Sequence, residues 1–229
     1  MSYRARQHLD LTLEFFGMAW QKLGVRRPDT PHPGVAARLS EHLHFYRAWR
    51  ANPKGIGAVL PSSPALAAAI TREIRPADGP VLELGSGTGA FTRALVARGV
   101  PQVDLALIEM DGEFARQLEA QYPMAQVCQV DAGRLADTPL LDGRRAAAAV
   151  CGLPLLNMPL RQQVNILRGA FVHLQPGGAF YLFTYGWRCP IAPRVLARLG
   201  LRARRLSTVY LNVPPAQVWK FARSRRWIG

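Results

Sequence analysis

The stretch "PVLELGSGTGAFT", Pro80 to Thr92, decides the fold because it reads as a short strand, a glycine turn and the start of a helix. Its glycines fit the pattern G-x-G-x-x-A, and an acidic residue, Glu109, follows about one strand and one helix later. On spacing alone, this pattern is close to the fingerprint of nicotinamide-dinucleotide domains. The residues around the turn must therefore show which kind of ligand it holds.

The surrounding sequence predicts an α/β domain, because short apolar runs typical of strands alternate with helical patterns. The expected strands cover residues 80–85, 104–109, 125–130, 146–151 and 178–184, and the expected helices 64–75, 89–98, 111–121 and 159–174. Two later apolar runs, 206–212 and 217–223, flank a short turn and predict an antiparallel hairpin. Parallel strands closed by such a pair are the layout of class I Rossmann-like methyltransferases, and dinucleotide domains seldom end in this way.

A separate region precedes this domain. Residues 8–23 predict a helix that is apolar on one side, contains Phe16 and Trp20, and is flanked by basic residues, as in helices that lie in a membrane interface. Residues 28–34 contain three prolines and a glycine and predict a linker. We expect residues 1–34 to be a membrane-associating extension and residues 35–229 to be the methyltransferase domain; the alternative is that the first helix packs on the domain.

Charge is the informative bulk property, since the chain carries a net charge of +14. Residues 1–142 hold fifteen residues of each sign, whereas the part after Asp142 holds fourteen Arg or Lys and no carboxylate. This asymmetry favours an anionic partner, nucleic acid or an anionic membrane surface. No signal peptide, membrane span, disulfide framework or zinc motif is apparent, so we expect a cytoplasmic protein.

Glu83 argues against a dinucleotide. It stands two residues before Gly85 and extends the pattern to E-x-G-x-G-x-G, through Gly87 and Gly89. A carboxylate aimed into a pyrophosphate site would be repelled. S-adenosylmethionine has no phosphate and carries a cationic sulfonium and an α-ammonium, which an acidic group can hold directly or through water. The sequence therefore predicts S-adenosylmethionine as the cofactor, with glycines where the backbone must pass close to it.

Further cofactor contacts are expected at the carboxyl ends of the neighbouring strands, where open α/β sheets bind their ligands. Glu109 can take both ribose hydroxyls, Met110 can pack on the adenine ring, and Asp131 can accept the adenine amino group. Asp111 would cap the helix that follows it, and Gly152 would let the fourth strand end close to the sulfonium. The predicted cofactor-binding residues are Glu83, Gly85, Ser86, Gly87, Gly89, Glu109, Met110, Asp131 and Gly152, and no metal site is predicted.

Four segments carry a resemblance to a known family: "FYRAWRANPKGIGAVLPSSPALA" (45–67), "LELGSGTG", "GLPLLNMP" (152–159) and "FTYG" (183–186). They are similar to those of the bacterial phospholipid N-methyltransferases, over about residues 1–223. The resemblance implies stepwise methylation of phosphatidylethanolamine toward phosphatidylcholine, by an enzyme that is peripheral on the inner face of the cytoplasmic membrane. A basic rim fits this expectation, because each Lys or Arg near an anionic lipid surface contributes about 1 kcal/mol.

The acceptor amine is mostly protonated at neutral pH and attacks only as the free base. The loops after the fourth and fifth strands contain no acidic base, so Tyr46, Tyr185, His42, His44 or a water must take the proton. Tyr185 is the first choice for orienting the amine, with Tyr46 second. Their rings, together with Trp187, can also stabilise the growing cation by cation–π contact.

The lipid phosphate requires a cation, and arginine binds phosphate oxygens bidentately. Arg188 and Arg50 are the candidates that we select, and Asn157 is expected to line the acceptor mouth.

Two rival functions use the same turn. Ribosomal RNA adenine dimethyltransferases share the E-x-G-x-G-x-G turn and a basic surface, but their N-[IL]-P-[YF] motif places a ring after the fourth strand that stacks on the flipped adenine. Here the equivalent residues, Gly152 to Leu155, include no ring. The other rival is a membrane-binding protein that keeps the cofactor only as a structural ligand. We expect no nucleic-acid partner.

Overall fold

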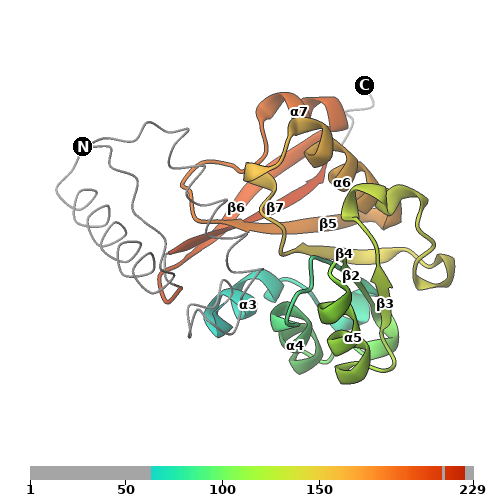
Figure 1. Ribbon diagram of the computed structural model, residues 1–229. Coiled ribbons are helices and arrows are strands. Elements are labelled where there is room, and N and C mark those ends of the chain that lie inside the picture. The colour runs from blue at the N-terminus through green and yellow to red at the C-terminus, as the bar shows by residue number, and fades with distance from the viewer. Residues whose placement is uncertain (1–62, 213–214, 225–229) are drawn as a thin grey trace, which may run out of the picture. The chain divides into compact units, whose positions relative to one another are not determined.

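The computed structural model describes residues 63–212 and 215–224, which are drawn in colour in Figure 1. Our predictions for the first helix, the linker, Tyr46 and Arg50 lie outside the described residues. The helices are α3 (Pro64–Thr71), α4 (Ala90–Ala97), α5 (Gly112–Gln121), α6 (Leu160–His173) and α7 (Pro193–Leu199), and the 3-10 turns are η1 (Pro76–Asp78), η2 (Gln102–Asp104), η3 (Ala132–Asp137), η4 (Leu141–Gly143) and η5 (Leu155–Asn157). The strands are β1 (Val81–Leu84), β2 (Leu105–Glu109), β3 (Gln126–Gln129), β4 (Ala146–Cys151), β5 (Leu174–Thr184), β6 (Leu201–Val209) and β7 (Ala216–Arg223).

The seven strands form one sheet in the order β3-β2-β1-β4-β5-β7-β6. Strands β1 to β5 run parallel, and β7 pairs antiparallel with both β5 and β6, so the predicted fold class is confirmed. The carboxyl ends of β1 to β5 therefore lie along one side of the sheet, which we call the carboxyl edge. Since Thr184 at the end of β5 pairs with Gln217, and Ala216 pairs with Val209, the turn after β6 also lies at this edge.

Helices cover both faces of the sheet, with α3, α4 and α5 on one side and α6 and α7 on the other (Figure 1). Alternate residues of β1 serve different cores, because side chains along a strand point to opposite faces. Leu82 and Leu84 belong to the core under α6 and α7, whereas Val81 belongs to the core under α3 and α4. Both cores consist of fully buried aliphatic and aromatic side chains. Among the described residues, no helix is long and apolar enough to cross a membrane.

Four elements, α3, α7, β5 and β6, differ clearly from the prediction. Helix α3 ends at Thr71 instead of Arg75, because the chain turns there and the Arg98 guanidinium binds the carbonyl oxygens of Arg72 and Ile74 at 2.8 and 3.0 Å. Helix α7 was not predicted, although Pro193 opens it and Gly200 caps it in the left-handed conformation. Strands β5 and β6 both begin several residues earlier than expected. These changes leave the strand order intact.

A partly exposed ion cluster ties the segment after α3 to the hairpin. The Glu73 carboxylate accepts from Lys220 Nζ at 2.7 Å and from the Arg204 guanidinium at 3.0 Å, and Tyr181 Oη donates to it at 3.4 Å. Burial raises the pKa of Glu73, but Lys220 and Arg204 together lower it by more, so its pKa lies below the ordinary value. One carboxylate thus binds side chains of β5, β6 and β7 to the segment between α3 and β1.

We expect Glu73→Gln to lower the free energy of unfolding by about 1–2 kcal/mol at pH 7. Because the folded pKa is depressed, this contribution exists above the unfolded pKa and is lost as the pH falls through the folded pKa. The difference from wild type should therefore shrink below about pH 4 in urea unfolding curves. Glu113→Gln is the matched control, since Glu113 pairs with Arg116 on the exposed surface of α5. An equal loss in both variants would contradict the role of the cluster.

Candidate active site at the carboxyl edge

The glycine turn after β1 is held in a conformation that side chains disfavour. Gly85, Gly87 and Gly89 have φ angles of +69°, +52° and +72°, all in the left-handed region. A Cβ on Gly85 would lie 2.4 Å from Leu153 Cδ2, so the turn is packed tightly on that side. A Cβ on Gly87 would meet nothing within 4 Å. The open side of the turn at Gly87 is therefore where a ligand can approach the backbone.

Glu109 lies across from this turn, at the end of β2. Its side chain is buried, and its two carboxylate oxygens accept from the Gly87 and Asp111 backbone N–H groups, both at 2.9 Å. Asp111 caps α5 through Oδ1, which accepts from Glu113 and Phe114 N–H, so this predicted cap is confirmed. The carboxylate that we expected to hold the ribose is thus fixed in direct contact with the glycine turn.

Glu83 is fully buried in β1, beneath the turn and not at its mouth. Its Oε2 accepts from Thr92 Oγ1 at 2.7 Å, while Oε1 has no hydrogen-bond partner. Burial raises the pKa of Glu83 to about 8, against which the Thr92 hydrogen bonds act only in part. Glu83 is therefore mostly protonated at neutral pH in the absence of ligand. In the ligand-free protein, Glu83 therefore repels a phosphate much less than the sequence analysis predicted.

A second buried polar atom near the turn has no partner. The Ser86 hydroxyl is buried without a hydrogen bond, like Glu83 Oε1. Buried polar groups in folded proteins are nearly always bonded, and exceptions commonly mark ligand or water sites. Two buried polar groups without partners, one in the glycine turn and one in β1, fit a polar ligand such as the amino-acid part of S-adenosylmethionine.

The remaining predicted cofactor residues lie along the same edge. Met110 follows Glu109, and its side chain is 57% exposed in the ligand-free protein. This exposure leaves it available to pack on the adenine ring, as predicted for it. Asp131 is exposed after β3, and its Oδ1 accepts from Gly133 N–H at 2.8 Å, so it also caps η3. Their roles toward adenine stay predictions.

Gly152, which follows β4, joins the loop after that strand to the glycine turn. Its N–H donates to the Leu84 carbonyl at 2.8 Å, and a Cβ on Gly152 would lie 2.7 Å from the Gly85 carbonyl oxygen. No side chain fits at this position. The contact of Gly152 with the turn was not predicted, and its predicted closeness to the sulfonium stays a prediction.

The loops after β4 and β5 carry the predicted acceptor residues. Tyr185 is half-buried, and its ring meets Phe183 edge-to-face with centroids 5.6 Å apart. Trp187 is 63% exposed, and Arg188 is also exposed. Asn157 is half-buried in η5, but its Oδ1 atom is buried without a hydrogen-bond partner. This orphaned oxygen was not foreseen, although Asn157 itself was selected.

Supporting contacts around these loops were missed by the sequence analysis. Gln163 on α6 is buried, and its Nε2 donates to the Met158 carbonyl at 2.9 Å, which fastens the "GLPLLNMP" loop. Asn212 is buried in the turn after β6, and its Oδ1 accepts from Ser63 N–H at 3.1 Å. Neither contact has a local sequence signal, because each partner lies on another element.

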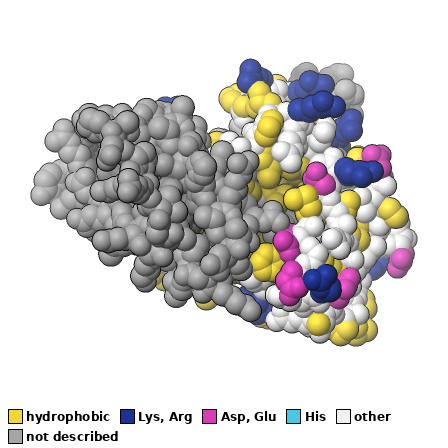
Figure 2. Space-filling model, viewed as in Figure 1, with side chains coloured by type: hydrophobic (Ala, Val, Ile, Leu, Met, Phe, Trp, Pro, Cys, Tyr) yellow, Lys and Arg dark blue, Asp and Glu magenta, His cyan; other side chains and the backbone are white. Residues whose placement is uncertain are grey.

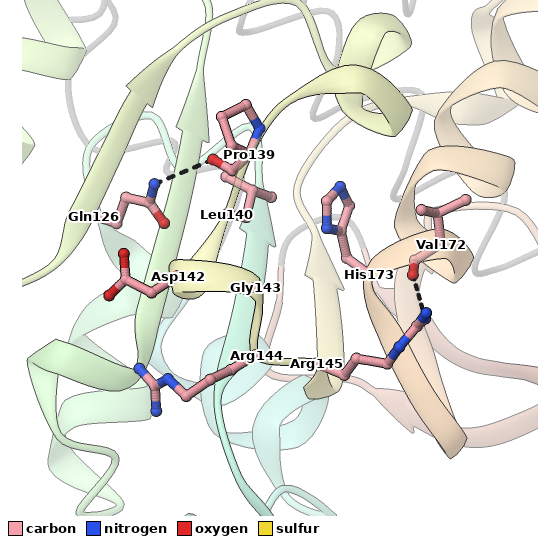
Figure 3. A pocket seen from close by; sticks show the side chains of 9 residues that line it. All are labelled: Gln126, Pro139, Leu140, Asp142, Gly143, Arg144, Arg145, Val172 and His173. Carbon is pink, nitrogen blue, oxygen red and sulfur yellow. Dashed lines mark hydrogen bonds between the residues drawn. The ribbon is translucent and has the colours of Figure 1, made fainter.

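One pocket lies at the opposite edge, between the start of β3 and the residues that precede β4 and β5 (Figure 3). Its polar groups serve the fold. Arg145 donates to the Val172 carbonyl at 2.5 Å, Gln126 donates to the Pro139 carbonyl at 3.2 Å, and Arg144 pairs with Asp104. This hollow is remote from the glycine turn, so we assign it no part in the chemistry. Among the described residues, no cluster of His, Cys, Asp and Glu could hold a metal ion.

Glu83→Gln should stabilise the ligand-free protein increasingly as the pH rises. The unfolded chain ionises Glu83 near pH 4.5 and the folded chain only near 8, so wild-type stability falls through this window. We expect the variant to be more stable at pH 8 by an amount on the order of a few kcal/mol, and nearly equal at pH 4. Urea unfolding at both pH values measures this, with Glu119→Gln on the exposed face of α5 as control. A pH-independent difference would show that Glu83 is ionised in the folded protein.

Comparison with known proteins agrees with this site. Residues 81–178 match the methyltransferase domain family. An ornithine lipid N-methyltransferase of Singulisphaera acidiphila is 32% identical over 134 residues, which cover 56% of this chain and 70% of the relative. A ribosomal RNA small subunit methyltransferase A of Anaeromyxobacter dehalogenans is 30% identical over 207 residues, covering 82% and 68%.

Solved structures show the same fold. A glycopeptide N-methyltransferase complexed with S-adenosylmethionine superposes with a TM-score of 0.57 at 15% identity, covering 71% of this chain and 95% of that one. A Burkholderia thailandensis 1,6-didemethyltoxoflavin-N1-methyltransferase gives 0.58 at 13% identity, covering 86% and 94%. With its family match, its two methyltransferase relatives and this fold, the chain belongs to the S-adenosylmethionine-dependent methyltransferases.

Proposed function

We propose that the protein transfers methyl groups from S-adenosylmethionine to the amine of phosphatidylethanolamine and of its methylated intermediates, at a membrane surface. The observation that carries this proposal is the chemistry of the acceptor loops. They combine the orphaned Asn157 Oδ1, the Tyr185 ring and the exposed Arg188, and they contain no carboxylate. An amine bound next to a phosphodiester matches these three groups. The lipid-methylating relative supports the same class of acceptor.

When bound, S-adenosylmethionine supplies an electrophilic methyl group on a sulfonium. The glycine turn and Glu109 would hold its nucleoside part, and Glu83 with Ser86 would face its cationic amino-acid part. Asn157 Oδ1 can accept a hydrogen bond from the acceptor N–H, which orients the nitrogen lone pair. Tyr185 would lie beside the amine as it gains charge, and Arg188 would bind the phosphate. Most of the rate enhancement would then come from alignment of the acceptor in a site shielded from water.

The proton on the acceptor amine must leave before methyl transfer. An amide oxygen such as Asn157 Oδ1 cannot take it at neutral pH, and the acceptor loops have no carboxylate. Among the described residues, Tyr185 is the candidate to take the proton, and a water is the alternative. The other candidates, Tyr46, His42 and His44, lie outside the described residues. Since only the free amine reacts, the rate should rise with pH as the amine deprotonates.

Methylation of adenine in ribosomal RNA is the second candidate, because one relative carries that name and matches most of the chain. Two features weigh against it. Gly152 has no room for a side chain where the RNA enzymes are expected to place an asparagine, and Leu155 is 1% exposed in the core where they place a stacking ring. A base flipped into this site would find neither contact.

Labelled S-adenosylmethionine separates these candidates. The protein should be incubated with vesicles of phosphatidylethanolamine and phosphatidylglycerol, with vesicles that contain an ornithine lipid, and with unmodified small-subunit ribosomal RNA. We expect label in mono-, di- and trimethylated ethanolamine lipids. Label in the ornithine lipid alone would keep the lipid-amine class but correct the substrate, and label in RNA alone would overturn the proposal.

Glu109→Gln should weaken S-adenosylmethionine binding about tenfold or more, because an amide nitrogen would face N–H and O–H donors in place of an accepting carboxyl oxygen. Isothermal titration calorimetry measures the affinity, and circular dichroism checks the fold. Glu119→Gln on α5 is the control and should bind as wild type. Equal affinity in all three proteins would remove Glu109 from the cofactor site.

Binding of the cofactor should also release a proton from Glu83. A cationic group brought near this buried carboxyl lowers its pKa below neutrality, so at pH 7 nearly one proton leaves for each cofactor bound. Calorimetry in two buffers of different ionisation enthalpy counts the proton, and Glu83→Gln should abolish the release. A wild-type protein that binds without releasing a proton would show that the cationic groups lie elsewhere.

A further inference from the structure

Large apolar side chains are exposed along the acceptor half of the carboxyl edge. Five residues, which we call the apolar rim, come from the loop after β4, the start of α6, the loop after β5 and the turn after β6. They are Leu156 (43% exposed), Leu160 (36%), Trp187 (63%), Tyr210 (64%) and Leu211 (83%). Scattered apolar residues on a surface need no explanation, but a set gathered at one edge does.

Strand pairing accounts for this gathering. β7 lies between β5 and β6, and it starts level with the end of each of them, so Tyr210 and Leu211 lie at the same edge as Trp187. The remaining exposed large apolar residues do not join the set. Val103, Met124 and Val172 precede strands and lie at the opposite edge, and Met110 lies on the cofactor side.

The charges around the apolar rim select its partner. Arg161 and Arg188 are exposed next to rim residues, and the loops and turns that carry the rim contain no Asp or Glu. In Figure 2 the uppermost charged side chains, over the α7 region, are all Lys or Arg. Trp and Tyr with aliphatic residues and arginines are the composition that enters a membrane interface. A nucleic-acid backbone offers the arginines phosphates but gives Leu211 and Leu160 nothing to bury against.

The apolar rim also borders the acceptor mouth. Asn157 stands between Leu156 and Leu160 in sequence, and Tyr185 and Arg188 flank Trp187. We propose that the protein docks on an anionic phospholipid bilayer through the apolar rim, with Tyr210 and Leu211 entering the headgroup layer. This rests on the proposed function, since docking in this orientation turns the acceptor mouth toward the lipid amines. A headgroup could then reach the site while its acyl chains stay in the bilayer.

The test measures binding and not methyl transfer. The full chain is sedimented with vesicles of phosphatidylglycerol and phosphatidylethanolamine at fixed salt. The double variant Tyr210→Ser with Leu211→Ser should bind about tenfold more weakly or worse, given the apolar area removed. Val103→Ser with Met124→Ser is the matched control at the opposite edge and should bind as wild type. Unchanged cofactor affinity by calorimetry shows that both variants are folded.

Leu211→Trp reports insertion directly. Its added fluorescence should shift to the blue on vesicles and be quenched by brominated acyl chains, whereas that of Val103→Trp should not. Equal vesicle binding by the rim variant and wild type, no vesicle binding by wild type, or a blue-shifted Leu211→Trp without vesicles would each overturn the proposal. Methyl transfer to detergent-dispersed phosphatidylethanolamine tests the proposed function separately, because it needs no bilayer.

Discussion

The contact between two stretches of backbone, the glycine turn after β1 and the residue that follows β4, is the constraint on which the site depends. Gly152 N–H reaches the Leu84 carbonyl at 2.8 Å, and the space for a Cβ is taken by the Gly85 carbonyl. No flexible side chain separates the glycine turn, which is the predicted cofactor site, from the loop after β4, which carries predicted acceptor residues. Since alignment of two reactants tolerates little error, a spacing set by backbone alone is well suited to a transfer reaction. Glu109 closes the other side of the same turn through Gly87 N–H.

This tight packing has an electrostatic consequence for Glu83. The turn and Thr92 cover the carboxyl completely, so burial raises its pKa to about 8 and leaves one oxygen without a partner. A stable fold would be better served by an apolar residue at this position of β1. A group that is unsatisfied in the free protein makes physical sense where a ligand satisfies it. The same burial means that Glu83 by itself is a weak electrostatic barrier to phosphate.

The sequence predicted the parts of this structure that follow from local pattern. The period-two and helical rhythms predicted five parallel strands and the hairpin, and the spacing from Glu83 to Glu109 predicted which strand ends meet. Three features depended on packing between distant segments and had no local signal. These are the depth at which Glu83 is buried, the orphaned oxygen of Asn157 and the end of α3 at Thr71, which the Arg98 guanidinium sets from another helix. Helix α7 had signals at both ends, but its seven residues are too few for a periodic pattern to stand out.

The sheet topology is needed to locate the excess of basic residues relative to the site. In sequence, the absence of carboxylates after Asp142 describes a basic half of a chain, which suits RNA and lipid equally. In the fold, that half forms β4 to β7 with α6 and α7, so Arg161 and Arg188 lie beside the predicted acceptor loops, whereas Arg144 and Arg145 lie at the opposite edge. A nucleic-acid enzyme needs those loops to present polar or stacking groups to a base. Here they also expose the aliphatic Leu156 and, from the neighbouring turn, Leu211, which a base or phosphate would leave in water. Cations beside exposed aliphatic side chains are matched by a surface that is anionic outside and apolar just beneath, which is a property of lipid bilayers and not of duplexes.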